Sequence, residues 1–129
     1  MILHSLLSTF KIRSENMFHL KREDNSYAII SFDEEIRLTG KKSVELKEWF
    51  KEQKIDNLKT IILDCQNVIF IDSMGIASII SLYKSITSLE KRMILSGLRK
   101  EVKEILTLLK LDKLFLMDDR NPEQIIKDL

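Results

Sequence analysis

Hydrophobic and polar residues follow two different periods along this chain. Apolar residues alternate with polar ones over 18–22, the mainly apolar residues 27–32 are interpreted as a second strand, and the turn-forming residues 24–26 separate the two stretches. This arrangement predicts an opening β-hairpin. A continuous apolar run such as the one from residue 60 is typical of a strand buried on both faces. The remaining predicted strands are apolar runs at 60–65, 92–95 and 114–116.

Four other segments place their apolar residues at helical spacing, three or four positions apart. They are residues 41–53, residues 73–89, the region of 102–109 and the stretch after Asn121 and Pro122. Asparagine followed by proline suits the N-cap and first turn of a helix. The predicted order is ββαβαβαβα, in which helices join strands that pair in parallel. The predicted fold class is α/β, a small mixed sheet covered by about four helices.

Composition limits the kinds of function that remain. The 129 residues suit one domain, and 44% hydrophobic with 32% charged residues is a soluble, globular balance. A net charge of +1 gives no electrostatic footprint for nucleic acid. The single cysteine, Cys65, cannot form an internal disulfide, and no apolar run approaches the length of a membrane helix. We therefore expect a cytoplasmic protein that binds neither nucleic acid nor membranes.

The first residues of the chain differ from the rest. Residues 1–16 have no clean period, and Met17 stands just before the first predicted strand. They lack the basic start and the small-residue cleavage pattern of a signal peptide. We expect residues 1–16 to be an N-terminal extension and residues 17–129 to form the domain.

The stretch Gln66–Gly75 is the candidate site, because ligands of open α/β sheets bind beyond the carboxyl ends of the strands. Either Asp72 or Ser73 can cap the helix that starts there. A glycine in a helix, here Gly75, indicates a close approach of backbone or partner, or else a packing constraint. Met74 suits either a recognition surface or a contact inside the domain.

No catalytic or metal-binding constellation accompanies this stretch. Asp64 and Cys65 have no neighbours at metal-ligand spacing, so they are interpreted as strand-end and core residues. His4 and His19 lie far from Ser73 in sequence and belong to no serine-hydrolase motif. We expect no enzyme activity, no metal and no cofactor.

The segment 61–80 resembles the signature of the STAS domain family. An apolar strand closed by Asp64 is followed by a short apolar loop and then by Asp72-Ser73-Met74-Gly75 at a helix start, as in that signature. The resemblance extends over about residues 18–129. It implies the STAS fold and the role of an anti-sigma factor antagonist, a partner-switching protein in transcription regulation and signal transduction.

What the resemblance implies for mechanism centres on Ser73. An anti-sigma factor serine/threonine kinase would phosphorylate this serine and would bind only the unphosphorylated protein. A PP2C-type phosphatase is a further implied partner. Asp72, Ser73, Met74 and Gly75 would form the partner-binding surface together with Arg37. Family members often have Gly-x-Leu-Asp after the second strand, whereas the matching stretch 33–37 ends in Arg37, and such a charge reversal alters partner choice.

Two other readings remain. The first is a STAS scaffold or subunit, in a stress-signalling or lipid transport complex, that works without phosphorylation. The intact Asp72-Ser73 pair argues against it. The second is a phosphoacceptor of the receiver kind, for which Asp64 would be the acceptor, but no lysine follows a strand end where receiver chemistry needs one.

Overall fold

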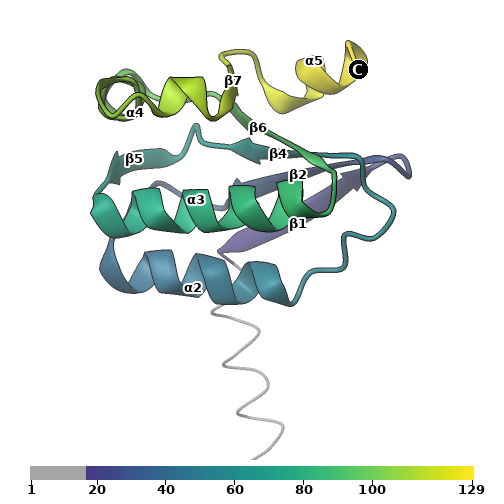
Figure 1. Ribbon diagram of the computed structural model, residues 1–129, viewed down its shortest axis with the longest axis horizontal. Helices are drawn as coiled ribbons and strands as arrows, with labels where there is room; N and C mark the ends of the chain where they lie inside the picture. The colour runs from purple at the N-terminus through teal and green to yellow at the C-terminus, as the bar shows by residue number, and fades with distance from the viewer. Residues whose placement is uncertain (1–16) are drawn as a thin grey trace, which may run out of the picture.

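The predicted hairpin opens the fold in the computed structural model, which describes residues 17–129 of the chain (Figure 1). Strand β1 (Phe18–Glu23) pairs antiparallel with β2 (Tyr27–Phe32). Asp24 turns the chain with a positive φ of 50°, and its carboxylate accepts the backbone N–H of Ser26 at 2.6 Å. Aspartate tolerates this conformation because its short side chain forms such local hydrogen bonds.

The main sheet has five strands in the order β1-β2-β4-β6-β7. Strand β4 (Thr60–Asp64) lies at its centre and pairs in parallel with β2 and with β6 (Arg92–Ser96). All five residues of β4 are buried, as the continuous apolar run predicted. Strand β7 (Leu116–Asp118) pairs in parallel with β6 and forms one edge.

Helices cover both faces of this sheet. Helices α2 (Gly40–Lys51) and α3 (Ser73–Ser88) lie side by side below it in Figure 1, and the short helix α5 (Pro122–Lys127) lies above. Helix α4 (Lys100–Leu108) packs against β5 (Val68–Ile71), a strand that lies outside this sheet. A small second cluster under α5 consists of buried isoleucines: Ile29, Ile62, Ile94 and Ile125. The predicted α/β class and the four helices are confirmed in the described residues.

Two short strands depart from the predicted order. Strand β3 (Ile36–Leu38) pairs in parallel with β5 (Val68–Ile71), and together they form a separate two-stranded sheet. The prediction of a loop before residue 72 is therefore wrong for Val68–Ile71. Each strand is too short to show a hydrophobic period of its own. Helix α2 and strand β4 also separate the two strands along the chain, so their pairing leaves no local signal in the sequence.

The last strand begins later than predicted. Residues 114–116 were expected to form it, but the strand is Leu116–Asp118. A single 3₁₀ turn, η1 (Leu111–Lys113), comes first, and the backbone N–H of Phe115 bonds to the carbonyl of Leu111 at 2.9 Å. Phe115 is buried and packs edge-on against Tyr83, with 5.5 Å between ring centroids. Its apolar character reflects core packing and not strand pairing.

The helices of residues 17–129 are all too short or too polar to cross a membrane. The predicted extension, residues 1–16, lies outside the described residues, as does His4.

Candidate functional site

The start of α3 fixes the geometry around Ser73. Asp72 is the N-cap: its backbone is extended, with φ −111°, and its carboxylate accepts the backbone N–H of Gly75 at 2.9 Å. Ser73 is therefore the first helical residue and not the cap. Its side chain is exposed, and its hydroxyl has no hydrogen-bond partner among residues 17–129. The hydroxyl is thus accessible for chemistry from outside the molecule.

Gly75 is buried where the first turn of α3 meets β3. A Cβ atom at this position would lie 2.0 Å from the carbonyl oxygen of Leu38 and 2.6 Å from Cγ1 of Ile71. Both distances are far below van der Waals contact, so only glycine permits this approach. The sequence left open whether Gly75 allows the close approach of a backbone or of a partner, or meets a packing constraint. In the structure, Gly75 allows the close approach of the Leu38 backbone within the domain. Gly75 supports the site from beneath and does not lie on its surface.

Arg37 lies next to Leu38 in β3, the strand that the first turn of α3 contacts. Arg37 and Phe70 are register partners across β3 and β5, and the guanidinium carbon lies 4.4 Å from the Phe70 ring centroid. This stacking is a cation–π contact. Phe70 is 39% exposed and Met74 is 47% exposed, so two large apolar side chains flank Ser73 in sequence and face solvent. Exposed aromatic, methionine and arginine side chains are those enriched in protein interfaces.

Two side chains that sequence reasoning missed hold the neighbouring loops. Asn67 donates its side-chain N–H to the carbonyl of Phe32 at 2.7 Å and so ties the start of β5 to the end of β2. Arg99 donates to the carbonyl of Gln66 at 2.8 Å and to the carboxylate of Glu35 at 3.0 Å. Phe70 was also missed, because a single exposed aromatic residue in an apolar run carries no signal of its own.

The residues at the end of β4 are structural. Burial raises the pKa of the Asp64 carboxyl, while the backbone N–H of Gln66, at 3.1 Å from Oδ1, lowers it and the charge of Glu123 raises it. Burial also raises the pKa of the Cys65 thiol far above its usual range, so this thiol is a core residue without nucleophilic character. No cluster of potential metal ligands occurs within residues 17–129.

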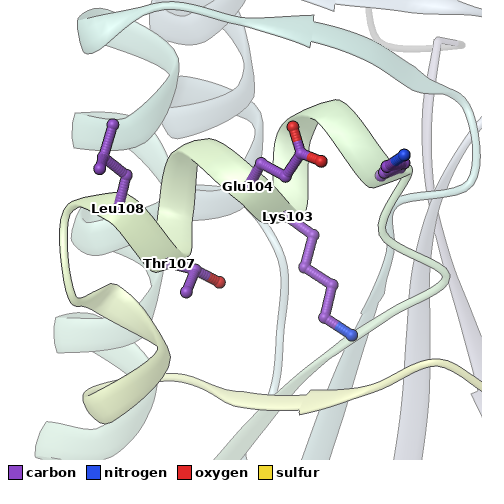
Figure 2. Close-up of a pocket in the computed structure, with 5 residues that line it drawn as sticks. Lys103, Glu104, Thr107 and Leu108 are labelled. Atoms are coloured by element: carbon purple, nitrogen blue, oxygen red, sulfur yellow. The ribbon is translucent and has the colours of Figure 1, made fainter.

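A hollow of about 420 Å³ lies along the outer face of α4, and Ser73 is not among the residues that line it (Figure 2). Its lining consists of residues three and four positions apart on that one helix: Lys100, Lys103, Glu104, Thr107 and Leu108. Figure 2 shows Glu104 and Lys103 pointing in opposite directions, and Lys103 pairs with Asp119 at 3.0 Å. Small-molecule sites need polar groups that converge. This hollow lacks them and adds nothing to the Ser73 site.

Known proteins share this fold. The sequence matches the STAS domain family over residues 20–124. A crystal structure from Thermotoga maritima, described as that of an anti-sigma factor antagonist, is 24% identical with a TM-score of 0.72, and the match covers 88% of this chain and 96% of that one.

Two further structures have the same fold. The anti-sigma factor antagonist SpoIIAA of Bacillus, in its unphosphorylated form, is 17% identical with a TM-score of 0.63, covering 86% of this chain and 96% of that one. The murine anion transporter Slc26a9 is 19% identical with a TM-score of 0.59, covering 67% of this chain but only 14% of the transporter. The family match spans most of the chain, and the chain therefore belongs to the STAS domain family.

Proposed function

We propose that this protein is an anti-sigma factor antagonist that binds an anti-sigma factor serine kinase only while Ser73 is unphosphorylated. The observation that carries the proposal is the exposed Ser73 hydroxyl at the start of α3, beside exposed Phe70 and Met74. In this proposal the protein is no enzyme and acts in the cytoplasm, and residues 17–129 form the working domain. Asp72, Ser73 and Met74, with Arg37 at the rim, meet the partner, and Gly75 sets their position.

The local structure suits a modification that leaves the domain folded. The kinase would transfer the γ-phosphoryl group of ATP to the Ser73 oxygen, releasing ADP and the hydroxyl proton. A phosphate at a helix N-terminus is stabilised by the helix dipole by about 0.3–1 kcal/mol. Because Ser73 is exposed and caps nothing, the added group breaks no internal hydrogen bond.

The same phosphate opposes docking. It adds about −1.5 to −2 charges next to the carboxylate of Asp72. Burying that charge without a counter-ion on the partner costs several kcal/mol. A penalty of about 2.8 kcal/mol already weakens binding about a hundredfold. The switch therefore needs no change of shape in this chain.

The relatives support this proposal in one respect. SpoIIAA, an anti-sigma factor antagonist with the same fold, has been solved in both an unphosphorylated and a phosphorylated form. A phosphorylated state is thus compatible with this fold. The identity of the kinase, and a PP2C-type phosphatase as the resetting partner, are parts of the proposal for this chain.

The proposal is tested by intact-mass measurement and peptide mapping after incubation with ATP and candidate serine kinases from the source organism. We expect one phosphate on Ser73 in the wild type and none in Ser73→Ala. Ser85→Ala is the matched control, because Ser85 is an exposed serine on the same helix, and it should be phosphorylated like the wild type. Phosphate on another residue, or on none, would contradict the proposal.

Binding provides the second half of the test. With the kinase that modifies Ser73, we expect the Ser73→Asp variant to bind at least about tenfold more weakly than Ser73→Ala, since aspartate carries less charge than phosphate. Circular dichroism should show the same fold for both variants. Equal affinities of the two variants would contradict the switch.

One other function has a specific observation in its favour. In the murine anion transporter the similar part is a small portion of a larger chain, so this fold also occurs as a built-in module. By analogy, the present chain would be a constitutive subunit. Stable co-purification with defined subunits, unchanged in Ser73→Asp, is the result that this alternative requires.

A further inference from the structure

Arg37 lies in β3, the short strand that contacts the first turn of α3. Leu38, its neighbour in β3, contacts the first turn through its carbonyl, which a Cβ on Gly75 would approach to 2.0 Å. Phe70, its register partner in β5, precedes Ser73 by three positions. Paired strands lie about 4.8 Å apart and an extended residue spans about 3.4 Å. The Cα atoms of Arg37 and Ser73 are therefore within the combined reach of an arginine and a phosphoserine side chain.

The Arg37 guanidinium stacks on an aromatic ring but has no anionic partner among residues 17–129. Stacking on the Phe70 ring at 4.4 Å restrains the side chain, while its N–H groups form no salt bridge with any residue of 17–129. Arg99 and Arg120, by contrast, each pair with a carboxylate. A guanidinium that is stacked on a ring keeps the N–H donors at its edge available for two oxygens of one anion.

Asp72, the acidic neighbour of Ser73 in sequence, forms no salt bridge with Arg37. The carboxylate of Asp72 accepts the N–H of Gly75 at 2.9 Å and is committed to capping α3. A phosphate on Ser73 would add a second negative charge beside it, and the helix dipole alone offsets only about 0.3–1 kcal/mol of that repulsion. A bidentate arginine is the counter-charge that matches a phosphate best.

We propose that Arg37 binds the phosphate of phosphorylated Ser73 within the same chain. The inference rests on the switch proposed above and adds its regulation: modification both introduces a charge and occupies the guanidinium that otherwise faces the partner. Arg37 and the Phe70 ring on which it stacks are then unavailable for docking.

The experiment uses phosphoserine incorporated at position 73 during translation, so that it depends on no kinase. The second ionisation of the phosphate is followed by ³¹P NMR as a function of pH in the full chain. A nearby cation favours the dianion and lowers its pKa. We expect the wild type to titrate about half a unit or more below the value of about 6 for free phosphoserine.

Substitutions of arginine residues test whether Arg37 causes the lowered pKa of the phosphate. Arg37→Gln should return the titration toward the free value, and Arg37→Lys should do so in part, because lysine keeps the charge but loses the bidentate geometry. Arg92→Gln is the control: Arg92 is an exposed arginine at the start of β6, and it should titrate like the wild type. Circular dichroism checks that each variant is folded.

Identical titrations of the wild type and Arg37→Gln would overturn the inference, even if Arg37→Gln weakened binding of a partner by the unphosphorylated protein. That result would leave the proposed switch intact. Conversely, failure of every kinase to modify Ser73 would remove the switch without changing the NMR titration. The two failures are therefore distinguishable.

Discussion

The start of α3 contains three residues with different structural roles: Asp72, Ser73 and Gly75. Asp72 satisfies an N–H group of the first turn, which leaves the Ser73 hydroxyl exposed and without a partner in residues 17–129. Gly75 allows the turn to contact Leu38. The sequence predicted that a helix starts here, but it left open which residue caps the helix. Capping geometry depends on one backbone angle, and aspartate and serine suit it almost equally.

Gly75→Ala measures how strongly the close approach to β3 matters. Alanine is favoured over glycine in a helix by about 1 kcal/mol, but its Cβ would lie 2.0 Å from the Leu38 carbonyl oxygen. Overpacking of a rigid backbone costs about 1–3 kcal/mol or more. We expect a net loss of about 2 kcal/mol in the free energy of unfolding, measured by urea denaturation.

A control on the same helix separates packing from helix propensity. Ser85→Ala changes an exposed position of α3 and should alter stability by less than about 0.5 kcal/mol. If Gly75→Ala were as stable as the wild type, the first turn of α3 would not be packed against Leu38. The placement of Arg37 beside Ser73 would then lose its support.

The pairing of β3 with β5 could not be predicted from the hydrophobic pattern of the sequence. Segments with a strong pattern were predicted nearly to the residue: the periodic helix 73–89 against the observed Ser73–Ser88, and the continuous apolar strand 60–65 against Thr60–Asp64. Strands β3 and β5 have three and four residues, and their pairing joins distant parts of the chain. Such pairing depends on tertiary packing, which local periodicity does not encode. For that reason the contact of Arg37 with Phe70 was not predicted, although Arg37 itself was singled out.

Asn67→Ala tests how the small sheet is attached to the main one. The variant loses the 2.7 Å hydrogen bond from the Asn67 side chain to the carbonyl of Phe32. An intramolecular hydrogen bond of this kind contributes about 1 kcal/mol to stability. We also expect faster hydrogen exchange at the amide of Ile36, which bonds to the Asn67 carbonyl at 2.7 Å.

The control is Asn57→Ala, an exposed asparagine in a turn, which should change stability by less than about 0.5 kcal/mol. Equal exchange at Ile36 in the wild type and Asn67→Ala would mean that the small sheet does not depend on this bond. The support of the Ser73 site would then come from the α3 contact alone.

At the scale of the whole domain, two carboxyl groups of residues 17–129 have pKa values that are shifted in opposite directions, and each makes stability depend on pH. Burial raises the pKa of Asp64, so the folded chain holds that proton more tightly than the unfolded chain. Hydrogen bonds from Arg120 lower the pKa of Asp118 to about 2, so the folded chain holds that proton less tightly. Neither pKa shift was predicted from the sequence. Asp64 is buried, and Asp118 meets Arg120, only once strands β4, β6 and β7 are packed together.

The signs define two separate windows. For Asp64, stability falls as pH rises from the unfolded value of about 3.9 to the higher folded value, because the carboxyl loses its proton in a buried place. For Asp118, stability is lost as pH falls from about 3.9 toward its folded pKa of about 2. Asp118 is exposed enough for salt to screen its interaction, so the second effect should shrink at high ionic strength.

Asp64→Asn should remove the first window and leave the second. The amide oxygen can still accept the backbone N–H of Gln66, which lies 3.1 Å from Oδ1 in the wild type, but it carries no charge to bury. We expect the variant to gain stability relative to the wild type as pH rises from about 4 to 7, measured by urea unfolding at each pH. Asp118→Asn is the matched control: its stability should run parallel to that of the wild type above about pH 4, and the difference between the two should shrink only below it. Parallel curves for the wild type and Asp64→Asn would show that Asp64 is not buried at the end of β4, and the sheet end beneath the Ser73 site would need a different description.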